Sequence, residues 1–202
     1  MSILYLLKQT ASWSLFEYSD IILSNFIDPK ISRNMVAGTH AVGALILSGG
    51  CLLLDGKEFE SLYTLAKLFS TGYFLFDTHY ILRNEQLTVT RCAWLYHHIA
   101  TIYYIHQDPI IYGGHKVLFW GELSNIPSYF VYYYLQLKLT YSYKFKIWST
   151  LQKVLYTGIR LPVMAKLAME TYGKATNIKP LALIMPIYAM GIIWTYKLLN
   201  QR

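Results

Sequence analysis

Long apolar runs, separated by short polar segments, make up most of this sequence. An α-helix rises about 1.5 Å per residue, so about 20 apolar residues are long enough to cross a hydrocarbon core of about 30 Å. Runs of this kind predict six transmembrane helices, at residues 35–54, 62–82, 87–106, 117–137, 148–169 and 181–199. Because the loops between them are short, we expect one all-α, polytopic membrane helical bundle without a separate hydrophilic domain.

The chain before the first of these runs has a different character. Its first 27 residues are apolar but contain three charged side chains, and they lack the small-residue cleavage site of a secretory signal. Ser14 and Glu17 have the spacing of a capping box, which predicts the start of a short amphipathic helix. We interpret residues 1–31 as an arm at the membrane interface and residues 32–202 as the transmembrane domain. A seventh membrane span is the alternative for the arm.

The composition also favours lipid over water as the surroundings. Hydrophobic residues make up 54% of the chain and charged residues only 14%, whereas soluble domains carry about 25% charged residues. The net charge of +7 does not indicate a nucleic-acid partner, because Lys and Arg are scattered between the apolar runs. The two cysteines are isolated in the sequence, which predicts neither a disulfide framework nor a metal site.

Basic residues are distributed unequally between the two sides of the predicted bundle. Four lie on one side: Lys57, Lys116, Lys174 and Lys179. Ten lie on the side that holds both termini: Lys8, Lys30, Arg33, Arg83, Arg91, Lys138, Lys144, Lys146, Lys197 and Arg202. Cytoplasmic segments of membrane proteins carry the excess of Lys and Arg, so we expect both termini in the cytoplasm.

Ionisable side chains inside the predicted spans indicate a polar interior. A charged side chain at the centre of a membrane helix costs about 2.5 to 3.5 kcal/mol, so such residues usually face a partner or a cavity. Three lysines lie near enough to span ends for their side chains to reach water. Seven residues remain: His40, Asp77, His79, His97, His98, Glu122 and Arg160.

His97 and His98 stand together in the third predicted span. Successive helical residues point about 100° apart, so we expect one histidine to face the cavity and the other to orient a neighbour or bond to an adjacent helix. Thr101 lies one turn beyond His97 on the same face. The HxxxH and HxxHH patterns of membrane iron enzymes are absent, so we predict no metal site.

Asp77 and Arg160 each have two interpretations. Asp77 and His79 are two residues apart on a helix and therefore point to different surroundings. Asp77 either accepts a hydrogen bond from the paired histidines, as a carboxylate does in nucleophilic triads, or pairs with Arg160. For Arg160 we expect an ion pair with Asp77 or Glu122, and the alternative is a cation kept for the anionic head group of a substrate.

Pro127 predicts a break in the fourth span, because its ring clashes with the carbonyl group of Leu123 and frees it. Ser124 and Asn125 are placed to satisfy the freed backbone groups. Glu122 is expected to face inward as an acid, a base or a counter-ion. A purely structural kink is the alternative interpretation.

Taken in order, these features resemble a known family. From residue 32 to the C-terminus the chain is similar to the TLC domain shared by ceramide synthases, translocon-associated membrane proteins and neuronal ceroid-lipofuscinosis membrane proteins. The matching residues are Ser32-Arg33, His40-Ala41, Tyr73-Phe74-Leu75-Phe76-Asp77, His97-His98, Glu122 with Ser124 and Pro127, Arg160 and Trp194. The resemblance implies about six helices around a lipid-accessible tunnel in the endoplasmic reticulum membrane, with the paired histidines deep inside.

The resemblance also implies roles for the polar residues. In ceramide synthases the histidines serve N-acylation of a sphingoid amine by acyl-CoA, so His97 or His98 would act as general base or transient acyl acceptor, supported by Asp77. The candidate lipid-binding residues are His40, Glu122, Ser124, Asn125 and Arg160. The synthase signature of His-Asp, followed three residues later by Asp, is replaced here by Gly121-Glu122 and Asn125, which resembles the smaller TLC-domain proteins instead.

The leading hypothesis is therefore a TLC-domain protein that handles acyl lipids and influences the sphingolipid and phospholipid composition of its membrane. Its partners would be membrane lipids, and no bound cofactor is predicted. One alternative is an N-acyltransferase with acyl-CoA as co-substrate and a long-chain amine as acceptor. Another is a non-catalytic lipid-binding or cargo-escort protein.

Overall fold

The computed structural model describes residues 3–175 and 177–200, and every regular element in these ranges is helical. The all-α class predicted from the sequence is therefore confirmed. The bounds are α1 Ile3–Ser24, α2 Pro29–Cys51, α3 Gly56–Asn84, α4 Val89–Ile105, α5 Pro109–Tyr112, α6 Gly114–Gln136, α7 Tyr143–Leu155, the π-helical turn Tyr156–Arg160, α8 Leu161–Lys174 and α9 Lys179–Asn200. Each of the six predicted spans coincides with α2, α3, α4, α6, the α7–α8 pair or α9.

Short polar side chains fix where several helices begin. Asp28 accepts a hydrogen bond from the backbone N–H of Lys30, and Pro29 occupies the first turn of α2. Thr88 accepts from the backbone N–H of Arg91 at the start of α4. Such side chains satisfy backbone donors that have no partner within the helix, and proline fits there because its missing N–H is not needed. The first residues of α2 and α4 are therefore determined by the local sequence.

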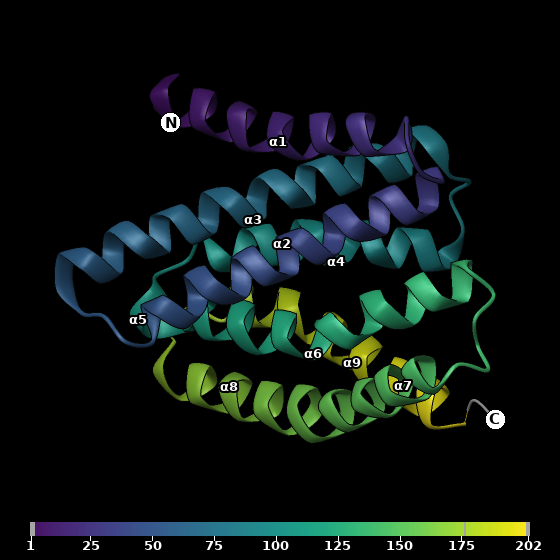
Figure 1. The fold of residues 1–202 in the computed structure, drawn as a ribbon. Coiled ribbons are helices and arrows are strands. Elements are labelled where there is room, and N and C mark those ends of the chain that lie inside the picture. Colours follow the sequence, from purple (N-terminus) through teal and green to yellow (C-terminus); the bar gives the residue numbers. More distant parts are fainter. Residues whose placement is uncertain (1–2, 176, 201–202) are drawn as a thin grey trace.

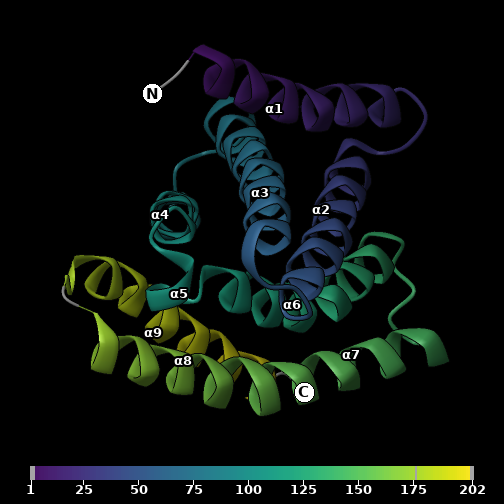
Figure 2. The ribbon, with the colours of Figure 1, turned by 90° about the vertical axis from the view of Figure 1, so that its left-hand side faces the viewer.

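The helices are arranged in layers around a central group. Figure 1 shows α2, α3, α4 and α6 running through the middle of the bundle, with consecutive long helices reversing direction. Figure 2 shows α1 covering α2 and α3 on one side, while α7 and α8 cross the opposite side below α6 and α9. The start of α1 and the end of α9 lie at opposite ends of the bundle (Figure 1).

Helix α1 passes through Ser14 without a break, so the predicted helix start at this residue is wrong. Its contacts with α3 explain the longer helix. The hydroxyl of Ser12 donates to the carbonyl oxygen of Leu68 at 3.0 Å, and Phe16 is buried in the aromatic core. A Cβ atom on Gly72 would lie 2.7 Å from the backbone carbon of Ser12, so glycine is needed for this close approach. Tertiary packing therefore overrides the capping-box signal.

Two hydrogen bonds at its ends define how far α1 extends across the bundle. The hydroxyl of Tyr5 lies 2.6 Å from Nε2 of His106, just beyond the end of α4. The hydroxyl of Ser32, near the start of α2, donates to the carboxylate of Asp20 at 2.6 Å. Helix α1 thus runs from one end of the bundle to the other, tilted across α3. The assignment of residues 1–31 to an interfacial arm stays a prediction.

The predicted break at Pro127 is also wrong, because α6 continues through this residue. The hydroxyl of Ser124 donates to the carbonyl oxygen of Gly121 at 2.8 Å, not to that of Leu123. One turn further on, Asn34 of α2 donates to the carbonyl oxygen of Tyr129 at 2.9 Å. Contacts with α2 therefore hold α6 together across the proline, as neighbouring helices do in membrane proteins.

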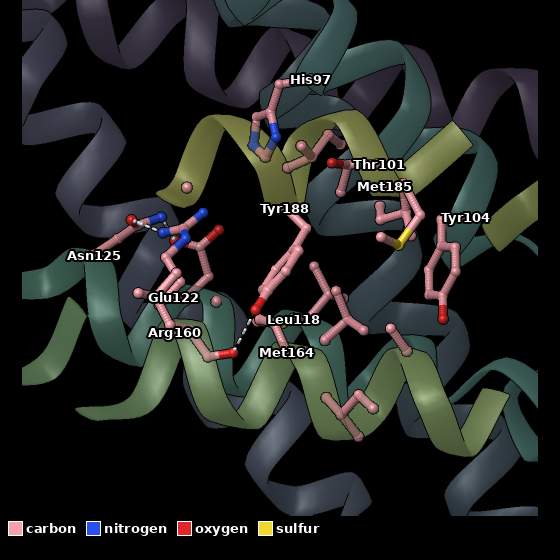
Figure 3. Close-up of a pocket in the computed structure, with 18 of the residues that line it drawn as sticks. His97, Thr101, Tyr104, Leu118, Glu122, Asn125, Arg160, Met164, Met185 and Tyr188 are labelled. Carbon is pink, nitrogen blue, oxygen red and sulfur yellow. Dashed lines mark hydrogen bonds between the residues drawn. The ribbon is translucent and has the colours of Figure 1, made fainter. Parts of the chain in front are cut away.

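The irregular backbone lies instead between α7 and α8. Five residues, Tyr156–Arg160, form a π-helical turn that ends two positions before Pro162. A proline removes an intrahelical hydrogen-bond donor and crowds the preceding turn, and a wider turn accommodates both effects. As a result Arg160 leaves the regular helical register and points into the bundle (Figure 3).

Among the described helices, only α9 is long and apolar enough by composition to cross a membrane. Only 17% of its most apolar window is buried, so most of this surface faces outward, unlike that of a soluble core helix. The other predicted spans fail the same test because their helices are shorter or carry more polar residues. Six apolar membrane spans were predicted, and among the described helices only α9 passes this test of length and composition.

Candidate functional site

A cavity of about 80 Å³ lies between α4, α6, α8 and α9, and we call it the inner cavity (Figure 3). His97, Thr101 and Tyr104 of α4 form one wall. The opposite side includes apolar side chains such as Leu118 and Met164. Polar groups gather at one end of this space, and the rest of its wall is mostly apolar.

A larger, more polar space of about 820 Å³ adjoins it, and we call this the vestibule. The vestibule lies where α2 and α4 begin and α3 ends, and its wall includes charged residues from all three helices. Four residues line both spaces: Phe74, His97, Glu122 and Asn125. A molecule that passed from the vestibule into the inner cavity would therefore meet His97 and Glu122 at the junction.

His98 is held between two side chains of α3. Its Nε2 atom lies 3.4 Å from Oδ2 of Asp77, and its Nδ1 atom lies 3.1 Å from the hydroxyl of Thr78. His98 is 3% exposed, so these contacts are shielded from solvent. One acceptor and one hydroxyl on opposite sides of the ring fix its orientation, as a carboxylate does in nucleophilic triads.

His97 faces the cavity instead. It lines both the inner cavity and the vestibule, with its ring edge-on to those of Phe74 and Trp94. Its Nδ1 atom is buried and has no hydrogen-bond partner within residues 3–175 and 177–200. This division of the pair, with one histidine facing the cavity and the other bonded to an adjacent helix, is what the helical geometry predicted.

Asp77 takes part in a chain of ion pairs at the end of the bundle. Its Oδ1 atom accepts a hydrogen bond from Nε of Arg33 at 2.8 Å. Arg33 also binds Glu85, and Glu85 in turn binds Arg91. Of the two interpretations of Asp77, the structure therefore supports the contact with the paired histidines, through His98, and the pairing with Arg160 is wrong.

The ion pair expected between Arg160 and Asp77 or Glu122 is not formed in the described part of the chain. Arg160 donates instead to the amide oxygen of Asn125 at 2.5 Å and to the hydroxyl of Tyr156 at 3.1 Å. The π-helical turn explains this choice, because it carries Tyr156 and Arg160 together toward α6. The hydrogen-bond partners of Arg160 beside the inner cavity are therefore neutral groups.

Glu122 lies at the same end of the cavity as Arg160 (Figure 3). It is 7% exposed, and one of its oxygens accepts a hydrogen bond from the amide nitrogen of Asn125 at 3.4 Å. Asn125 therefore lies between the carboxyl group of Glu122 and the guanidinium of Arg160, and it forms a hydrogen bond with each of them. The predicted inward orientation of Glu122 is confirmed.

Two predicted site residues lie away from the cavity walls. His40 is fully buried, with its ring stacked on Tyr73 at 4.0 Å between centroids, and neither ring nitrogen has a hydrogen-bond partner in the described ranges. Ser124 is fully buried behind Arg160, with a 3.5 Å contact to its guanidinium. Neither lines the inner cavity or the vestibule, so the structure offers them no direct contact with a lipid.

His79 points away from the site, as its spacing from Asp77 predicted. It is exposed and lies 3.5 Å from the carboxylate of Glu17 on α1. Over the residues that the structure describes, no three His, Cys, Asp or Glu side chains form a group suited to a metal ion.

Sequence reasoning missed several residues of the site. Arg33 and Arg91 were counted as topology signals, Arg33 also entered the family resemblance, and Glu85 was not considered. All three line the polar part of the vestibule. A usable signal was present, because charges of opposite sign fall at the start of one predicted span, the end of the next and the start of the third. Two tyrosines carried no comparable signal, since tyrosines are frequent throughout this chain: Tyr156, which bonds to Arg160, and Tyr188, which lines the inner cavity.

No family model, curated protein or solved structure matches this chain. The resemblance to the TLC domain therefore stays a prediction. The chemistry of the site has to be inferred from its own geometry.

Proposed function

We propose that this chain is a multi-pass, TLC-like membrane protein that binds an acyl lipid and thereby influences membrane sphingolipid and phospholipid composition. The lipid's polar head would lie near His97, Glu122 and Arg160, and its acyl chain would extend along the inner cavity. The observation that carries the proposal is the junction itself: a polar vestibule and a mostly apolar cavity share His97, Glu122 and Asn125. A molecule with a polar head and an apolar tail matches this arrangement.

The outer surface supports a membrane location. Large apolar side chains are exposed in the middle of several helices, including Ile46 of α2, Ile99 of α4 and Ile193 of α9. Monomeric soluble proteins rarely expose large contiguous apolar surface, whereas lipid-facing helices do. We infer that α2, α3, α4, α6, α7–α8 and α9 cross the membrane, with their polar residues turned to the interior.

Helix α1 is the proposed seventh crossing, because it runs from one end of the bundle to the other (Figure 1). The surplus of Lys and Arg then keeps the end of α9 and the vestibule on the cytoplasmic side. The start of α1 lies on the opposite side, which replaces the expectation of two cytoplasmic termini. The endoplasmic reticulum, implied by the TLC resemblance, is the proposed membrane.

Lipid retention tests the binding proposal. The protein would be purified in detergent, and its retained lipids would be extracted and identified by mass spectrometry. We expect wild-type protein to retain acyl lipids and Glu122→Gln, which replaces the buried carboxyl group at the junction by an amide, to retain several-fold less. Lys144→Gln is the matched control, because Lys144 is exposed on α7 and lines neither space. Equal retention by wild type and E122Q would contradict the proposal.

A second candidate, N-acyl transfer from acyl-CoA to a long-chain amine, is favoured by the position of His98 between Asp77 and Thr78. In this reaction the amine nitrogen attacks the thioester carbonyl carbon, so the C–N bond forms and the C–S bond breaks. The proton lost by the nitrogen passes through an imidazole to the departing thiolate. An oriented histidine beside the junction is suited to this general-base step.

Product analysis separates the two candidates. Purified protein would be incubated with acyl-CoA and a sphingoid amine, and the amide product would be measured by mass spectrometry. The catalytic candidate requires product that is lost in His97→Ala or His98→Ala and kept in His79→Ala, whose side chain is exposed and paired with Glu17. If no amide forms while acyl lipids are retained in a Glu122-dependent manner, the protein binds lipids without turnover.

A further inference from the structure

The inner cavity has a defined far end. Figure 3 shows Glu122, Asn125 and Arg160 at one end of the cavity and Tyr104 at the other. His97, Thr101 and Tyr104 follow one face of α4, and Tyr104 lies seven positions after His97, a rise of about 10 Å. The cavity therefore runs along α4, from a polar end to a tyrosine.

Tyr104 is held rigidly in place. Its side chain is 2% exposed, and its hydroxyl donates to the carbonyl oxygen of Tyr112 in α5 at 2.7 Å. The same hydroxyl lies 3.3 Å from the hydroxyl of Thr171 in α8. The rings of Tyr104 and Tyr112 also meet edge to face. A ring fixed by contacts with two other helices acts as a wall and not as a swinging gate.

A second space lies behind this wall. It has a volume of about 390 Å³, and its lining includes Tyr112 and Thr171, the two hydrogen-bond partners of Tyr104. Leu167 lines both this space and the inner cavity. The two spaces are therefore neighbours, and Tyr104 with its partners closes the inner cavity toward the second one.

We propose that Tyr104 sets the longest straight acyl chain that the inner cavity admits. The inference rests on the proposed function, because it takes the polar head to lie at the junction and the methyl end to point toward Tyr104. Each buried methylene strengthens binding about fourfold until the chain reaches the ring. A longer chain must then bend or displace Tyr104 from two hydrogen bonds, so affinity stops rising.

Binding of a chain-length series tests the proposal. The probes are straight-chain saturated fatty acids of increasing length, which compete with a fluorescent fatty acid for purified protein in detergent. We compare wild type with Tyr104→Ala, which removes the wall, and with Tyr104→Phe, which keeps the ring. For an acid two methylenes beyond the wild-type limit, we expect Y104A to bind on the order of tenfold more tightly, and Y104F to keep the wild-type limit.

Tyr63→Ala is the matched control. Tyr63 is as buried as Tyr104 and donates its hydroxyl to the carbonyl oxygen of Ile105 at 2.6 Å, but it lines neither the inner cavity nor the space behind Tyr104. A shift toward longer chains in Y63A equal to that in Y104A would overturn the proposal, because general loosening would then explain both. If Y104A does not yield folded protein, Tyr104→Leu is used in its place. It removes less of the side chain, so we expect a smaller shift toward longer fatty acids.

The outcomes also distinguish this inference from the function on which it rests. Fatty acids that compete in a Glu122-dependent manner, with the same length limit in Y104A as in wild type, would overturn the role of Tyr104 alone. Competition that is absent in wild type and every variant would overturn the proposed lipid-binding function itself.

Discussion

The Nε2 atom of His98 lies 3.4 Å from the Oδ2 atom of Asp77, so a histidine and a carboxylate join α4 to α3 inside the bundle. The other oxygen of Asp77 accepts from Arg33 of α2 at 2.8 Å. A single carboxylate on the wall of the vestibule therefore connects three helices. Its contribution to stability and its support of His98 depend on the same contacts.

Replacing Asp77 by Asn should destabilise the protein strongly. The change leaves the largely buried guanidinium of Arg33 without one of its two acidic partners, and breaking a buried ion pair costs about 3 kcal/mol or more. Unfolding of the purified protein in detergent, followed by circular dichroism, measures the loss. Glu170→Gln is the control, because its pair with Lys166 is exposed and 3.9 Å long and should contribute less than about 1 kcal/mol. Equal losses in the two variants would refute the structural role of Asp77.

The packing of α1 on α3 can be tested at a glycine. In Gly72→Ala the new Cβ would meet the backbone of Ser12 at 2.7 Å, so α1 would have to move, at a cost of about 1 to 3 kcal/mol. Gly173→Ala in α8 is the matched control, since a Cβ there meets nothing within 4 Å. We expect a lower unfolding midpoint for G72A only. A midpoint unchanged in both variants would mean that α1 does not pack closely on α3.

The helices and the orientation of the paired histidines were predictable because both depend on local sequence. An apolar run of sufficient length predicts a helix, and helical geometry alone separates the faces of His97 and His98. The capping-box start at Ser14 failed for the opposite reason. There, contacts with Leu68 and Gly72, far away in the sequence, decide the structure.

The partners of Asp77 and Arg160 were not predictable in the same way. Which charges meet depends on how helices are rotated and shifted against one another, and a pattern within one helix carries no such information. The π-helical turn is a clear case, because it brings Arg160 into hydrogen bonds with Asn125 and Tyr156 and not into an ion pair with Asp77 or Glu122. Proline at residue 162 was visible in the sequence, but the turn that accommodates it was not.

Arg160 should not be replaceable by Lys. The Nη1 atom of its guanidinium donates to both Asn125 and Tyr156, and the group carries further N–H donors on Nε and Nη2, whereas lysine has a single nitrogen for every contact. The loss of one charge-assisted hydrogen bond to the carboxylate of the bound fatty acid would correspond to about tenfold weaker binding. We expect this loss in fatty-acid competition by Arg160→Lys, and no change in Lys144→Arg on the exposed face of α7. Wild-type affinity in R160K would argue against a role for Arg160 at the polar end of the cavity.

The proposed topology predicts opposite accessibility for two loops. Tyr141, 94% exposed between α6 and α7, lies on the proposed cytoplasmic side, and Lys57, at the start of α3, lies on the other. Cys92 is exposed and would be replaced by Ser to remove background, while Cys51 is buried and can stay. In sealed membrane vesicles with the cytoplasmic face outward, a membrane-impermeant maleimide should label Tyr141→Cys at once and Lys57→Cys only after permeabilisation. The proposed topology places three crossings, α3, α4 and α6, between the two loops, so the loops must lie on opposite sides. Labelling of both cysteines from the same side would therefore contradict this topology, which the lipid-binding proposal requires.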